Sequence, residues 1–182
     1  MVAIDQKRNK KEKSDNCRGF TLIELIITLT IIVIVASIAV VSFQRLAVNS
    51  SLKTAARDIA ADFAQLKARA ISGDRDATTP GNIVIRMYRI SLNVAGNSYQ
   101  LQQCNNPGSP CGGWTIIQNK NLSRYANDII FNSGATNIAN CDIQTRGTVN
   151  PWGTVGLSNS RGSTARIVIN STGRTRVEFT LQ

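Results

Sequence analysis

Residues 18–44 read RGFTLIELIITLTIIVIVASIAVVSFQ, and this stretch decides the fold. From Phe20 to Gln44 it contains one charged residue, Glu24. The run from Leu25 to Gln44 forms, as a helix, a rod about 30 Å long, which matches the hydrocarbon core of a bilayer. The sequence therefore predicts a membrane-spanning helix over residues 20–44 with a single carboxylate near its start.

A basic block precedes this helix. Residues 1–19 contain six Lys or Arg and three Asp or Glu, a net charge of +3. The positive-inside rule then places residues 1–19 in the cytoplasm and the chain after the helix on the other side of the membrane. A secretory signal peptide fits poorly, because the apolar run is long and no A-x-A site in a polar context follows it. A permanent signal anchor is the alternative.

The stretch Arg18-Gly19-Phe20-Thr21-Leu22-Ile23-Glu24-Leu25 resembles the processing site of type IV prepilins and of the pseudopilins of type II secretion. The resemblance implies that a prepilin peptidase of the inner membrane cuts between Gly19 and Phe20 and N-methylates Phe20. Glu24 is then expected to pair with the terminal ammonium group of a neighbouring subunit, which fixes the register of a filament. The alternative is a Glu24 carboxylate that reaches water at the membrane surface.

One feature departs from many pilins, which have a proline near the position of Val41. Residues 39–43 read AVVSF, so nothing in the sequence interrupts the helix there. Beyond Arg45 the apolar residues follow a helical period, in the stripe Leu52, Ala56, Ile59, Phe63, Leu66 and Ala70. The sequence thus predicts one helix over about Phe20–Ile71, apolar in residues 20–44 and amphipathic in residues 45–72.

The part from residue 73 onward is predicted to be a β-rich globular domain, 73–182. Strands are expected at Asn82–Asn93, Ser98–Gln103, Gly113–Gln118, Asp128–Phe131, Gly153–Leu157, Arg166–Asn170 and Arg174–Leu181. The fold class is therefore α+β, a long N-terminal helix packed on antiparallel sheet. This resembles the pilin branch that contains the pseudopilin GspH and the minor pilins FimT and FimU. Residues 112–117 and 146–149 resemble recurring elements of that branch.

Four cysteines are present, at positions 17, 104, 111 and 141. Cys17 lies in the leader, and the other three lie where disulfides persist. The turn-rich residues 105–110 favour a Cys104–Cys111 bond with Cys141 free, but Cys104–Cys141 and Cys111–Cys141 stay open. We expect no metal site, because the Cys104–Cys111 spacing is too long for a CxxC motif and no fourth ligand exists.

The composition argues against an enzyme. The chain has no His, which excludes His-based nucleophile systems and His-ligated metals. No paired-carboxylate motif and no phosphate-binding Gly-rich loop is present, so we expect neither a catalytic residue nor a cofactor. The net charge of +10 favours an anionic partner instead.

The C-terminal residues 146–182 hold five Arg and one acid, Glu178. Gly173, Arg174 and Arg176 resemble the Gly-Arg-x-Arg motif of FimT-type minor pilins, which bind DNA in natural transformation. In an extended chain Arg174 and Arg176 would share one face and offer two guanidinium forks to phosphates. Arg161 and Arg166 are candidates to extend this patch. The alternative is that these residues keep an edge strand soluble.

Two functions follow as hypotheses. The first is a minor type IV pilin that binds DNA through backbone phosphates, independent of sequence, for uptake in transformation. The second is a structural minor pilin or type II secretion pseudopilin that primes or caps a filament. In both, the partners are other pilins, the prepilin peptidase and the inner membrane, with the C-terminal domain in the periplasm before assembly. The sequence leaves open which machine the subunit serves and its place in the filament.

Overall fold

The structure is a computed structural model that describes residues 21–73, 87–104, 111–126 and 128–182, apart from the side chains of residues 39–42. The predicted cleavage site between Gly19 and Phe20 lies outside the described residues, as does Cys17. The chain divides between Ser42 and Phe43 into two compact units. We describe each unit by itself.

Helix α1 extends over Leu22–Ser72, within a residue or two of the predicted bounds. At its start the Thr21 hydroxyl accepts a hydrogen bond from the Glu24 backbone N–H at 3.3 Å. This is the N-terminal half of a capping box, the Thr-x-x-Glu pattern that satisfies otherwise unpaired N–H groups. At its end Gly73 adopts the left-handed conformation, φ +67°, that commonly terminates helices.

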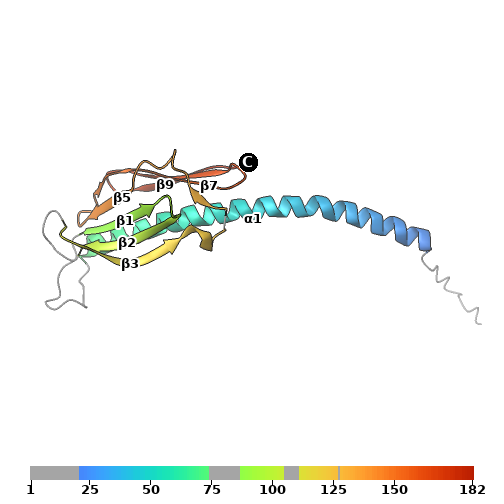
Figure 1. The fold of residues 1–182 in the computed structure, drawn as a ribbon, viewed down its shortest axis with the longest axis horizontal. Coiled ribbons are helices and arrows are strands. Elements are labelled where there is room, and N and C mark those ends of the chain that lie inside the picture. Colours follow the sequence, from blue (N-terminus) through green and yellow to red (C-terminus); the bar gives the residue numbers. More distant parts are fainter. Residues whose placement is uncertain (1–20, 74–86, 105–110, 127) are drawn as a thin grey trace, which may run out of the picture. The chain divides into compact units, whose positions relative to one another are not determined.

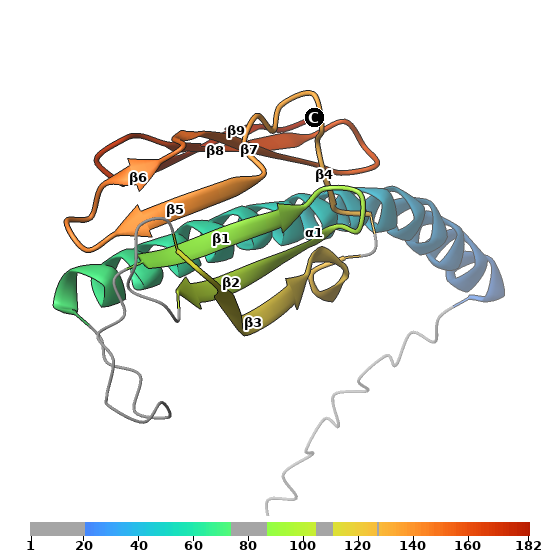
Figure 2. The ribbon, with the colours of Figure 1, turned by 60° about the vertical axis from the view of Figure 1, so that its left-hand side comes forward.

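Nine β-strands follow in two antiparallel sheets within the described part of the chain (Figures 1 and 2). The five-stranded sheet has the order β3-β2-β1-β5-β6. Its strands are β1 Met87–Asn93, β2 Ser98–Cys104, β3 Trp114–Asn121, β5 Asn140–Gln144 and β6 Val149–Asn150. The short 3-10 helix η1, Leu122–Arg124, follows β3.

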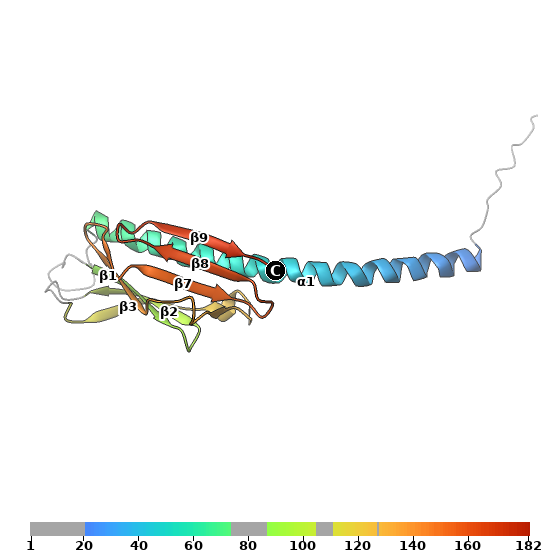
Figure 3. The same cartoon turned by 90° about the horizontal axis from the view of Figure 1, so that it is seen from above.

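The four-stranded sheet has the order β4-β7-β8-β9. Its strands are β4 Ile130–Phe131, β7 Gly153–Ser158, β8 Thr164–Ile169 and β9 Thr175–Thr180. Seen from above, β7, β8 and β9 lie over the C-terminal part of α1 (Figure 3). The other sheet lies on another side of that part of α1 (Figures 1 and 2).

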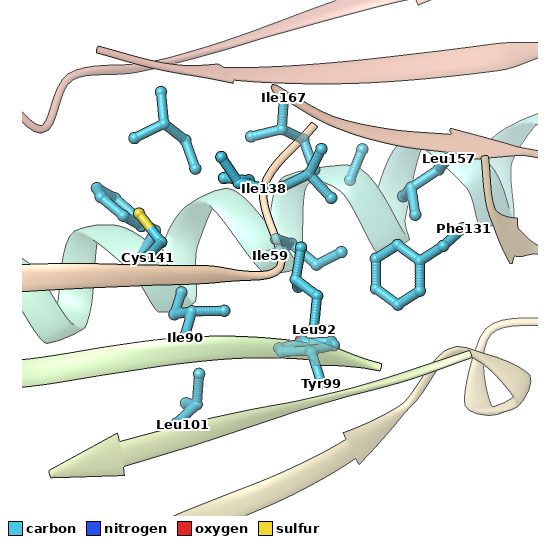
Figure 4. Close-up of a cluster of buried hydrophobic side chains, with 14 of the residues drawn as sticks. Ile59, Ile90, Leu92, Tyr99, Leu101, Phe131, Ile138, Cys141, Leu157 and Ile167 are labelled. Carbon is cyan, nitrogen blue, oxygen red and sulfur yellow. The ribbon is translucent and has the colours of Figure 1, made fainter. Parts of the chain in front are cut away.

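The core forms where α1 meets both sheets (Figure 4). Every residue of the stripe predicted for the second half of α1 is buried, with Ala55 beside it. Ile90, Leu101 and Cys141 approach from the five-stranded sheet, and Leu157 and Ile167 from the other. The alternation of buried and exposed residues along β8 is what β-periodicity predicts. The expected α+β class is confirmed.

A polar contact joins α1 to the five-stranded sheet within this core. The Asp62 carboxylate receives Lys120 Nζ at 2.7 Å and the Tyr99 hydroxyl at 2.7 Å. The side chains of Lys120 and Asp62 are 11% and 10% exposed. The pKa of Tyr99 is raised well above its usual range. Burial is the largest cause, and the hydrogen bond to Asp62 is the second. This contact fixes the position of α1 against β2 and β3.

Three details of the sheets differ from expectation. β5 and β6 were not predicted, because β5 has only two buried side chains, Cys141 and Ile143, among polar residues. The strand expected over Asp128–Phe131 is two residues long, since η1 and a turn precede it. Of the strand expected over Asn82–Asn93, the structure describes the part from Met87 onward.

Candidate functional site

The N-terminal unit presents an apolar helix surface. Its described side chains from Thr21 to Ile38 are all exposed, and they are mostly Ile, Leu and Val. By length and composition α1 contains one segment able to cross a membrane. A surface of this kind is stable only when lipid or other apolar helices cover it. This unit is therefore a candidate membrane and assembly segment.

Glu24 lies one turn from the start of that surface. Its backbone N–H is held by Thr21, while its carboxylate is exposed and has no partner among the residues that the structure describes. The carboxylate is thus available to a group outside this chain. The sequence signal for the cap is the presence of Thr21 three residues before Glu24, which sequence reasoning missed.

The basic candidate site lies on hairpin turns, and three turns of the domain share the same hydrogen-bond pattern and backbone conformation. Three turns close with a backbone hydrogen bond from a glycine N–H to a carbonyl three residues earlier, and each glycine has a positive φ. The pairs are Gly147 with Gln144, Gly162 with Asn159, and Gly173 with Asn170. A left-handed residue at the end of a turn is most often glycine, because glycine has no Cβ to oppose a positive φ. Gly173, the glycine of the Gly-Arg-x-Arg pattern, therefore has a structural role in closing this turn.

The turn between β8 and β9 is fixed by the side chain of Asn170. Its Oδ1 accepts hydrogen bonds from the Arg174 N–H at 2.8 Å and from the Thr172 hydroxyl at 2.9 Å. Arg174 consequently lies in the turn, one residue before β9, and not on the strand as expected. Its side chain is exposed.

This turn packs against the turn between β5 and β6. The Val149 N–H donates to the Ser171 carbonyl at 3.0 Å. Lys67 of α1 reaches beneath the turn, and its Nζ donates to the carbonyls of Thr172 at 2.9 Å and Gly173 at 3.2 Å. Two hairpins and the helix thus meet at one end of the domain.

The packing of these two turns brings Arg146 and Arg174 to the same end of the domain. Each is exposed, and neither guanidinium has an ion-pair partner among the described residues. Together with Lys67 they form what we term the basic end, defined as Lys67, Arg146 and Arg174. Sequence reasoning did not place Lys67 or Arg146 in a site, because their proximity to Arg174 depends on contacts between distant segments.

The remaining arginines of the predicted patch lie elsewhere. Arg176 is on β9 and forms an exposed ion pair with Glu178, which reduces its local charge. Arg166 lies on β8 directly opposite Glu178. Arg161 lies in the turn that precedes β8, whereas Arg174 follows β8, so the length of that strand separates them. The structure therefore does not bring Arg161 together with Arg174, with which the sequence pattern had grouped it.

The cysteines adopt the pairing that the sequence favoured. Cys104 and Cys111 form a disulfide, and Cys141 is a buried free thiol. Burial, with a smaller contribution from the charge of Asp142, raises the pKa of Cys141 to about 12. The disulfide closes the loop between β2 and β3 and belongs to the scaffold.

Comparisons with known proteins agree with this organisation. Residues 14–40 match the family described as the prokaryotic N-terminal methylation motif. The structure of the minor pseudopilin EpsH from the type 2 secretion system of Vibrio cholerae is similar, with a TM-score of 0.51 and 15% identity, over 70% of this chain and 96% of that chain. The chain therefore carries a prokaryotic N-terminal methylation motif, and its fold is similar to that of the EpsH pseudopilin.

A second solved structure, the type IV minor pilin FimU of Pseudomonas aeruginosa, aligns with a TM-score of 0.49 and 17% identity, over 71% of this chain and 90% of that chain. No curated protein matches the sequence. The motif covers the end of the leader and most of the apolar helix 20–44, and the similarity to EpsH concerns the fold.

Proposed function

We propose that this chain is a minor, non-catalytic subunit of a type IV pilus or a type II secretion pseudopilus. The observation that carries the proposal is the exposed apolar surface of residues 21–38, which lies within the match to the prokaryotic N-terminal methylation motif, residues 14–40. Lipid covers this surface before assembly, and the helices of neighbouring subunits cover it in the filament. The Glu24 carboxylate then pairs with the ammonium group that cleavage after Gly19 creates at Phe20.

The first experiment follows processing and incorporation in cells. N-terminal sequencing of the mature protein should begin at an N-methylated Phe20. Glu24→Val should be processed but absent from sheared filaments, with Glu24→Asp as the conservative control. A mature protein that still begins with Met1, or a Glu24→Val subunit present in filaments at the wild-type level, would overturn the proposal.

We further propose, as a second candidate function, that the basic end binds the phosphate backbone of DNA. Two exposed guanidinium groups from separate turns, Arg146 and Arg174, support it. Arg is suited to bidentate contact with phosphates, and the turn gives both groups a fixed base. The chain from Arg45 onward carries a net charge of +8, which favours approach to a polyanion.

Duplex DNA binding by the full chain in non-ionic detergent, measured against salt, tests this candidate. Arg146→Gln with Arg174→Gln should weaken binding and reduce the slope of log K against log salt by about 2. Lys53→Gln with Arg57→Gln removes the same charge from α1 and should leave binding largely unchanged. Equal effects of the two double variants would mean that binding reflects net charge and not this site.

A further inference from the structure

A second basic feature lies at the other end of the globular unit. A hollow of about 320 Å³ is lined by Arg45, Arg161 and Gln182. Arg45 belongs to α1, and Arg161 belongs to the turn between β7 and β8. Neither the assembly segment nor the basic end uses these residues. We term this hollow the juxtamembrane pocket.

Hydrogen bonds fix the walls of the pocket. Asn49 of α1 donates through Nδ2 to the Gln182 carbonyl at 3.3 Å, and Asn159 donates through Nδ2 to Asn49 Oδ1 at 3.2 Å. The Gln182 N–H donates to Ser163 Oγ at 3.0 Å. The helix, the turn and the residues after β9 are therefore held together around the hollow.

The two arginines give the pocket a concentrated positive charge. Within the part of the chain that the structure describes, the Arg45 and Arg161 side chains have no hydrogen-bond or ion-pair partner. The acid of the neighbouring segment, Asp128, accepts a hydrogen bond from Ser160 at 2.9 Å and is not paired with either arginine. An anion bound between the two guanidinium groups would offset their mutual repulsion. Guanidinium forks are matched to phosphate oxygens.

The position of Arg45 in the chain identifies the source of that anion. Arg45 directly follows the apolar run Leu25–Gln44, so it lies at the membrane surface when that run spans the bilayer. Exposed apolar side chains flank the pocket residues in sequence: Phe43 and Leu46 beside Arg45, and Leu181 beside Gln182. A phosphate group next to exposed apolar surface is the chemistry of a phospholipid and not of a free ion.

We propose that the juxtamembrane pocket binds the phosphate of an anionic phospholipid headgroup while the subunit is in the membrane. Arg45 and Arg161 hold the phosphate, and Leu46 and Leu181 lie against the glycerol and acyl region. The lipid orients the globular unit against the membrane surface before assembly. This inference rests on the membrane-spanning segment in the proposed function and adds a ligand to it.

The test uses the full chain purified in non-ionic detergent. Phosphatidylglycerol, phosphatidylcholine or inorganic phosphate is added, and lipid binding is measured by native mass spectrometry together with the shift in thermal unfolding. The wild-type chain should bind phosphatidylglycerol preferentially. Arg45→Gln with Arg161→Gln should weaken that binding about 30-fold, about fivefold for each guanidinium group. Lys53→Gln with Arg57→Gln, which removes equal charge from α1, should bind like the wild type.

Several outcomes would overturn the inference. These are equal binding of phosphatidylglycerol and phosphatidylcholine, equal losses in the two double variants, or stabilisation by inorganic phosphate as large as that by phosphatidylglycerol. The last outcome identifies a free anion as the ligand. Near-ultraviolet circular dichroism of the variants shows that they are folded. Filament incorporation is measured separately, so a wild-type chain that assembles but does not bind phosphatidylglycerol preferentially contradicts this inference and not the proposed function.

Discussion

Gly173 belongs both to the Gly-Arg-x-Arg pattern and to the contact between the β8–β9 and β5–β6 turns. Its φ of +67° is a left-handed conformation. A Cβ at this position would lie 2.8 Å from the Gly147 carbonyl oxygen and 3.1 Å from the Lys67 side chain. The close contact between the two turns of the basic end therefore requires a residue without a side chain.

Gly173→Ala should destabilise the protein through both backbone strain and this overlap. Gly73 is a matched control, since it has the same φ of +67° and a Cβ placed there would have nothing within 4 Å. We expect a loss of about 1 kcal/mol for Gly73→Ala and about 1–3 kcal/mol more for Gly173→Ala. Denaturant unfolding of the two variants measures the difference, and equal losses would refute the contact argument.

Cys141 should make stability depend on pH. Its pKa is raised to about 12 in the folded chain, from an ordinary value near 9, because it is buried. A raised pKa means that the folded state keeps its proton while the unfolded state loses it. The stabilising contribution is therefore complete below about pH 9 and is lost as pH rises toward 12, by at most about 1.4 kcal/mol per pH unit.

The measurement is the free energy of unfolding between pH 8 and 10. Below about pH 9 Cys141→Ala should lower stability by a constant amount, and above pH 9 its profile should be flatter than that of the wild type. Tyr99 and Tyr125, whose pKa values are also raised by burial, add their own dependence only above about pH 10. Parallel profiles for the wild type and the alanine variant would contradict the prediction.

Between elements, the decisive polar contact is the one that joins α1 to the five-stranded sheet. Apolar side chains of the α1 stripe and the sheets can pack in several orientations. The hydrogen bonds from Lys120 and Tyr99 to the Asp62 carboxylate form in only one. A buried pair of this kind fixes register and position more than it adds stability. On the other sheet, the Arg176–Glu178 ion pair is exposed and lies within β9, so it does not fix one element against another.

Lys120→Met should leave the Asp62 carboxylate buried without its cation and cost about 3–5 kcal/mol. Glu178→Gln, which removes one partner of the exposed pair, should cost less than about 1 kcal/mol. Thermal or denaturant unfolding of both variants provides the comparison. If Lys120→Met cost no more than Glu178→Gln, the contact between α1 and the sheet would be an ordinary surface ion pair.

At the scale of the whole molecule, the two compact units have separate roles. All buried hydrophobic residues of the described chain lie in the unit from Phe43 onward, while the described side chains of residues 21–38 are exposed. The described side chains of residues 21–38 are therefore not members of that core. The proposed function needs this separation, because there the N-terminal helix passes from a lipid to a protein environment.

The fragment 43–182, produced in an oxidising compartment, should therefore fold alone. We expect one cooperative unfolding transition within about 5 °C of that of the full chain in detergent, since the core is intact and a change of about 1 kcal/mol shifts Tm by that amount at this size. Calorimetry of both proteins tests this. A fragment with helical circular dichroism but no cooperative transition would show that the apolar helix is needed for the fold.

The sequence alone determined the features that depend on local pattern. These are the apolar run, the leader and its processing motif, the helical stripe, the antiparallel strands that have strong alternation, and the favoured Cys104–Cys111 pairing. Such features follow from chain periodicity, charge and short loops, so neighbours in sequence suffice to predict them.

Only the tertiary structure decided which basic residues act together. It separated Arg161 from Arg174 by the length of β8, paired Arg176 with Glu178, and placed Arg146 and Lys67 at the turn that carries Arg174. It also joined Arg45 to Arg161 around one pocket. The physical reason is that a charged surface is assembled from segments distant in sequence, and their proximity follows from how the sheets pack on the helix.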